Sequence, residues 1–146
     1  MALRLLRAVW FLSMVAALGA LLYVYASLPQ EVVVQHEENA NVSITNEVFF
    51  YVVMVFMAIT NVTVYIIAKV FNRQEDLRIW FFGLITTLNI FFIIGMNFIS
   101  LYNSSEKFEY SRIAFVIYGS VGLIVIWAAS WPVYLVFKRI NSKPLV

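Results

Sequence analysis

Charged residues are absent from four long stretches of this chain, and this distribution constrains the fold more than any other feature. Each stretch contains at least 21 consecutive residues without Asp, Glu, Lys or Arg: 8–30, 48–68, 79–105 and 113–137. A helix of about 20 apolar residues crosses the hydrocarbon core of a bilayer and satisfies its own backbone polar groups where no water is present. The pattern predicts an all-α integral membrane protein with four transmembrane helices, at about residues 8–28, 48–70, 79–102 and 112–137.

Composition agrees with this class. Hydrophobic residues make up 63% of the 146 residues and charged residues 12%, against about 45–50% and about 25% in soluble domains. The longest segment between the stretches, residues 31–47, is too short to form a core of its own. We therefore expect a single four-helix membrane domain over residues 1–146. The absence of Cys excludes disulfides, thiolate metal sites and Cys nucleophiles.

Most cations lie at one end of the predicted spans. Eight of the ten Lys and Arg residues precede the first span, connect the second to the third, or follow the fourth, whereas Lys107 and Arg112 lie on the other side. Because Lys and Arg concentrate in cytoplasmic loops, both the N and the C terminus are expected in the cytoplasm. The net charge of +2 reflects these membrane flanks, so no nucleic-acid partner is expected.

The N-terminal segment also has features of a secretory signal peptide, since Arg4 and Arg7 precede an apolar run with small residues near its end. That run reaches Leu28, whereas the apolar region of a signal peptide spans about 7–15 residues. We expect the first helix to be retained.

The first exported loop has the pattern of a short β-hairpin. Strand-forming residues at 32–34 and 42–45 flank a turn-rich segment at 37–41. An isolated hairpin is marginal in water, so the helix ends or a partner would have to hold it. The loop is also acidic and lacks Lys and Arg; its titratable residues are Glu31, His36, Glu37, Glu38 and Glu47.

Groups for catalysis or metal binding are scarce. His36 is the only histidine and lies in this exported loop, which leaves no bis-His haem site, His-rich zinc centre or Ser-His-Asp triad. Glu37 and Glu38 follow it directly, but adjacent residues of a strand point to opposite faces. A solvated acidic loop is therefore favoured over a metal site, and we expect no cofactor and no enzyme activity.

Asparagine and threonine supply the polar groups inside the spans. Asn61 lies eight residues before Lys69 and Asn89 eleven residues after Arg78, or about 12 and about 16 Å at helical rise, so the two amides share a similar depth. Interhelical hydrogen bonding is the favoured interpretation. The alternative is a polar passage for a proton, an ion or a lipid headgroup, but the charge-free stretches contain no acidic, basic or histidine side chain that would mark one. The residues expected in interhelical polar contacts are Thr60, Asn61, Thr86, Asn89 and Asn97.

Small residues in the first and fourth spans predict close helix packing, with Gly19, Gly119 and Gly122 as the main positions. They would serve either the internal packing of a four-helix bundle or the docking of another subunit. The sequence leaves both alternatives open.

The junction after the first span carries one family resemblance. Residues 25–36, YASLPQEVVVQH, resemble the Leu-Pro, short strand, His pattern of bacterial membrane proteins related to the immunity protein against sporulation-delaying peptide. Those proteins continue with a turn that contains Asn and Gly, whereas residues 37–41 of this chain contain no Gly. The resemblance implies a bacterial inner-membrane protein that protects against, or senses, an exported peptide, and it assigns no site residue.

Taken as a whole, the sequence favours a non-catalytic accessory or scaffold subunit of a larger inner-membrane complex, whose partners are the lipid bilayer and other membrane subunits. Packing residues are frequent and reactive groups are few, which is the basis of this expectation. One alternative is peptide immunity or sensing, in which the acidic loop contacts a cationic peptide. A second alternative is a small transporter or oligomeric channel, whose polar pathway would pass the amides of Asn61 and Asn89 at their shared depth.

Overall fold

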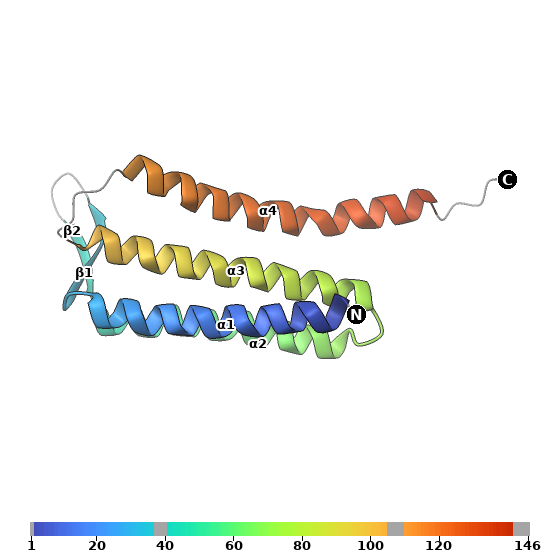
Figure 1. Cartoon of the computed structure of the whole chain (residues 1–146), viewed down its shortest axis with the longest axis horizontal. Helices are drawn as coiled ribbons and strands as arrows, with labels where there is room; N and C mark the ends of the chain where they lie inside the picture. Colours follow the sequence, from blue (N-terminus) through green and yellow to red (C-terminus); the bar gives the residue numbers. More distant parts are fainter. Residues whose placement is uncertain (1, 37–40, 105–109, 142–146) are drawn as a thin grey trace.

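Four long helices form most of the computed structural model, which describes residues 2–36, 41–104 and 110–141 (Figure 1). Each helix is long and apolar enough to cross a membrane, which confirms the four predicted spans in length and composition. Each helix also continues past its charge-free stretch, because helical hydrogen bonding does not stop where charged residues begin. The helices are α1 (Ala2–Ser27), α2 (Asn46–Val70), α3 (Glu75–Tyr102) and α4 (Tyr110–Asn141).

Helix α3 is the centre of the arrangement. Helices α1, α2 and α3 all contact one another, whereas α4 contacts α3 and no other described helix or strand. Figure 1 shows α4 along one side of α3, with α1 and α2 on the opposite side. The fold is thus a three-helix bundle with a fourth helix packed on one of its members.

Two apolar clusters form the core of the three-helix bundle. Along α2, Asn61 lies between Met57 of the first cluster and Val64 of the second, so a polar level separates the two clusters. The first cluster lies toward the hairpin and buries Ala17, Leu21, Val24, Leu28, Val32, Phe49, Met57 and Met96. The second cluster lies toward the opposite end of the bundle and buries Val64, Ala68, Phe82 and Ile85.

Two antiparallel strands confirm the predicted hairpin: β1 (Glu31–His36) pairs with β2 (Asn41–Thr45). Val32 lies opposite Ile44, and a bulge interrupts the register between Val33 and Gln35. Val32 is fully buried in the first apolar cluster, so the hairpin covers the end of the bundle.

Asn103, at the C-terminal end of α3, ties the hairpin to the helices. Its Oδ1 accepts from the Val33 backbone N–H at 2.7 Å, and its Nδ2 donates to the Val33 carbonyl at 3.0 Å. The side-chain amide therefore pairs with Val33 as a neighbouring strand would. The expectation that helix ends hold the hairpin is confirmed by this contact.

We predict that Asn103→Ala exposes the Val33 backbone without unfolding the helices. A hydrogen bond contributes about 1 kcal/mol, so hydrogen exchange at the Val33 amide should accelerate about fivefold. Asn97→Ala is the matched control, because the exposed Asn97 amide bonds only to the Ile93 carbonyl of its own helix among the described residues. Unchanged exchange at Val33 in Asn103→Ala would contradict the prediction.

Candidate functional site

A pair of buried amides joins α2 to α3 in the middle of the bundle. Asn61 Nδ2 donates to Asn89 Oδ1 at 2.9 Å, and Asn89 Nδ2 donates to Asn61 Oδ1 at 3.1 Å. Asn89 is fully buried and Asn61 is 6% exposed. The predicted interhelical contact at a shared depth is confirmed for these two residues.

Helix α1 completes this polar layer with Trp10 and Ser13. Trp10 Nε1 donates to Asn61 Oδ1 at 2.9 Å, and Asn89 Nδ2 donates to Ser13 Oγ at 3.0 Å. Asn61 Nδ2 also donates to the Met57 carbonyl at 2.9 Å. Both N–H groups of each amide are therefore used, and the layer links all three helices of the bundle.

The side chains of this layer hold the three helices together. None of the four side chains of the layer, Trp10, Ser13, Asn61 and Asn89, changes its charge near neutral pH. Apolar clusters lie on both sides of it. Each amide that left the layer would leave a donor or acceptor unpaired in an apolar surrounding, so the contacts favour one register of the three helices.

The other predicted polar residues lie outside the layer. The Thr86 hydroxyl donates to the Phe82 carbonyl at 2.9 Å, and Asn97 Nδ2 donates to the Ile93 carbonyl at 2.8 Å, so both bond to their own helix. Thr60 is half-buried, and no interhelical hydrogen bond of its hydroxyl occurs among the described residues. The expected interhelical contacts are wrong for Thr86 and Asn97, because a Thr or Asn side chain inside a helix reaches the carbonyl of the preceding turn.

Trp10 and Ser13 were not foreseen as partners of the asparagines. A tryptophan close to the charged start of α1 has the pattern of an interfacial anchor, and it is instead half-buried against the ring of Phe82, with centroids 5.4 Å apart. The sequence feature that could have indicated this role is their spacing, because Trp10 and Ser13 are three residues apart and share one face of the helix.

The acidic residues predicted in the loop between α1 and α2 are placed only in part. Glu31 and Glu47 are exposed, at the start of β1 and in the first turn of α2. His36 ends β1, and its side chain lies outside the described part, as do Glu37 and Glu38 altogether.

The glycines chosen for close packing are not sites of close contact within the described chain. A Cβ atom at Gly19, Gly119 or Gly122 would meet no heavy atom within 4 Å. The internal alternative is therefore wrong for all three. Gly83, which had not been singled out, is the glycine that permits a close approach, because a Cβ there would overlap the indole ring of Trp127 on α4.

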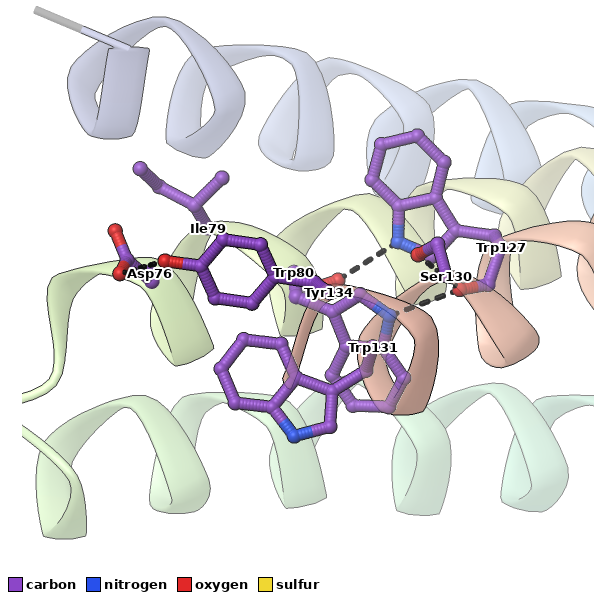
Figure 2. A pocket seen from close by; sticks show the side chains of 7 residues that line it. All are labelled: Asp76, Ile79, Trp80, Trp127, Ser130, Trp131 and Tyr134. Carbon is purple, nitrogen blue, oxygen red and sulfur yellow. Dashed lines mark hydrogen bonds between the residues drawn. The ribbon is translucent and has the colours of Figure 1, made fainter. Parts of the chain in front are cut away.

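Tryptophans fasten α4 to α3 next to Gly83. Trp80 Nε1 donates to the Trp127 carbonyl at 2.8 Å, and Trp127 Nε1 donates to the Trp80 carbonyl at 2.9 Å (Figure 2). The Trp131 ring lies 5.7 Å from Trp80 and 5.6 Å from Tyr134, measured between centroids. These rings line a cleft of about 290 Å³ between the two helices, and Figure 2 shows how its lining side chains lie.

An exposed polar contact continues this interface toward the end of the helices. The Tyr134 hydroxyl donates to Asp76 Oδ2 at 2.6 Å, and Lys138 Nζ lies 3.5 Å from the same oxygen. The side chains of Lys138 and Asp76 are 62% and 56% exposed, so the ion pair contributes little to stability. Since Asp76 lies on α3 and Lys138 on α4, the contact favours one orientation of α4 along α3.

Two arrangements therefore stand out: the polar layer that holds α1, α2 and α3 together, and the tryptophan contact that attaches α4. Both join helices, and neither places a nucleophile beside a base. In comparisons with known proteins, no family model, no curated protein and no solved structure matches this chain.

Proposed function

We propose that this chain is a non-catalytic accessory or scaffold subunit of a larger membrane complex, and that it docks a transmembrane helix of a partner on the outer face of α4. The observation that carries the proposal is the one-sided packing of α4, which contacts only α3 among the described elements.

Helix α4 has two different faces. The face toward α3 consists of buried and half-buried residues at heptad-like spacing: Ile113, Ile117, Ser120, Ile124, Trp127 and Trp131. The opposite face carries Phe115, Tyr118 and Ile126, which are 78%, 74% and 71% exposed. Gly119 is exposed and Gly122 half-buried. At about 100° of rotation per residue both lie on the half of the helix that points away from α3, and along the axis they lie between Tyr118 and Ile126.

Apolar exposure alone does not indicate a partner in a membrane, because lipid tails cover such a surface equally well. Two glycines one turn apart between large side chains form a notch into which another helix backbone can approach. Helix association in bilayers depends on such close packing of small residues. The docking alternative for Gly119 and Gly122 is therefore favoured by what surrounds them.

The polar layer supports the same proposal. All amide N–H groups of Asn61 and Asn89 are bonded within the bundle, so they are not available to line a path for an ion. The orientation with both termini in the cytoplasm of a bacterium, in its inner membrane, belongs to the proposal. It is supported by the position of cations along the chain: Arg4 lies near the start of α1, Lys69 near the end of α2, and Arg73 in the connection from α2 to α3. Figure 1 shows the start of α1 and the α2–α3 connection at the same end of the bundle.

Affinity purification of the tagged protein from its own membranes in a mild detergent, followed by mass spectrometry, tests the proposal. We expect a stoichiometric partner with the wild type and a loss of at least about tenfold in its recovery with Gly119→Leu or Gly122→Leu, because a leucine fills the notch.

Gly19→Leu is the matched control, since Gly19 is an exposed glycine on α1 with equally open space around its Cα. It should leave partner recovery unchanged. Recovery of the wild type without any partner would reject the proposal, as would equal losses in all three variants.

A further inference from the structure

A second cleft, of about 350 Å³, lies at the end of the three-helix bundle opposite the hairpin, between the start of α1, the end of α2 and the start of α3. Three cations line it, one from each helix: Arg7 of α1, Lys69 of α2 and Arg78 of α3. The aromatic residues Trp10 and Tyr65 complete its walls together with Phe82. No carboxylate is among the described residues that line it.

The position of these cations along the chain sets their depth in a membrane. Arg7, Lys69 and Arg78 are each the residue that directly bounds a charge-free stretch, before residue 8, after residue 68 and before residue 79. The cleft therefore lies where the apolar helices meet the headgroup region.

The cleft also contains a donor without an acceptor. Arg78 Nη1 donates to the Asn72 carbonyl at 3.3 Å, but Arg78 Nε is buried and has no hydrogen-bond partner among the described residues. Buried N–H groups are nearly always bonded, and a charged one more so. The Arg7 guanidinium, in turn, lies over the Phe82 ring, 5.8 Å from the ring centroid.

We propose that this cleft binds the phosphate of an anionic phospholipid headgroup. A phosphate offers several acceptor oxygens to a guanidinium and relieves the repulsion among three neighbouring cations. Basic clefts between transmembrane helices at a headgroup interface bind such lipids. The apolar walls formed by Tyr65 and Phe82 give an acyl chain a surface to follow, which a free phosphate ion would not use.

Thermal unfolding of the delipidated full-length protein in a neutral detergent tests the proposal. Dioleoylphosphatidylglycerol should raise the Tm in a saturable way, whereas dioleoylphosphatidylcholine at equal concentration should not. Arg78→Gln should weaken the apparent affinity for phosphatidylglycerol by about tenfold, which corresponds to about 1.4 kcal/mol. Native mass spectrometry should show a matching loss of the retained anionic lipid.

Arg4→Gln is the matched control, because Arg4 is an exposed cation on the same helix as Arg7 but does not line the cleft. It removes the same charge and should leave the affinity unchanged. Should Arg78→Gln fail to fold, Arg7→Gln takes its place, with the same expected loss.

Three outcomes would overturn the proposal. Equal losses in Arg4→Gln and in the cleft variant would mean attraction by net charge alone. Equal Tm shifts with phosphatidylcholine would mean that the headgroup charge is not recognised. Stabilisation by inorganic phosphate that competes with phosphatidylglycerol and reaches the same extent would assign the site to a free phosphate ion.

Discussion

Replacing Gly83 with alanine is expected to release α4 from α3 while the three-helix bundle stays folded. The added Cβ would overlap the Trp127 ring, which cannot move aside without breaking its hydrogen bond to the Trp80 carbonyl. Overpacking in a well-packed contact costs about 1–3 kcal/mol, and lost hydrogen bonds add to this cost. We expect these two costs together to weaken the contact between α3 and α4 by about 3 kcal/mol. Because α3 is the only described element that α4 contacts, this loss should separate the two helices.

Hydrogen exchange in detergent micelles measures this release helix by helix. Amides in α4 should lose protection in Gly83→Ala, whereas those in α1 and α2 should keep it. Gly95→Ala is the matched control on the same helix, because a Cβ at Gly95 would meet no heavy atom within 4 Å. If the α4 amides of Gly83→Ala kept the protection that they have in the wild type, the contact between residue 83 and Trp127 would accommodate a methyl group and the prediction would be wrong.

Asn89→Leu is expected to destabilise the bundle by about 2 kcal/mol. Single interhelical hydrogen bonds in membranes average about 0.6 kcal/mol and reach about 1.7 kcal/mol. Asn89 makes three side-chain hydrogen bonds, two with Asn61 and one with Ser13, and its loss leaves the buried Asn61 amide short of a donor and an acceptor. A buried group without its partner costs about 1–3 kcal/mol, which raises the expected effect above that of a single bond.

Unfolding in mixed micelles, followed by circular dichroism, measures the loss. The double variant Asn61→Leu with Asn89→Leu should be less destabilised than the sum of the two single variants, since it removes both partners of the pair. Asn97→Leu serves as the control, because Asn97 is an exposed amide of the same helix that bonds to its own Ile93 carbonyl. Strict additivity of Asn61→Leu and Asn89→Leu would reject the pairing as the source of stability.

Helix positions could be predicted from the sequence because each apolar helix is encoded locally, by its own charge-free stretch. In a bilayer, a charge-free stretch of this length becomes helical to satisfy its backbone polar groups, whatever its neighbours are. The β-hairpin was predictable for a similar reason, since strand formers around a turn-rich segment encode it within residues 31–45. Its attachment through Asn103 was not, because that contact joins residues 70 positions apart.

Only those members of the polar layer could be predicted whose side chains are clearly polar within an apolar span. Asn61 and Asn89 are rare residues in their spans, and counting from the charged flanks places them at one depth. Trp10 carried no such signal, because tryptophan near a span end is ordinary. Thr86 and Asn97 had the signal of Asn89 but bond within α3, since the helix itself offers them acceptors.

The sequence by itself thus determined that the chain has four long apolar helices, where each of them lies along the chain, and the hairpin between the first two. Only the tertiary structure decided which faces of these helices meet and that α3 is central. It also decided that α4 contacts α3 alone among the described elements, and that Gly83 rather than Gly119 permits a close helix contact. The physical reason is the solvent. In water a buried helix face is apolar and an exposed one polar, but in lipid both are apolar, so hydrophobic periodicity does not reveal the contacts.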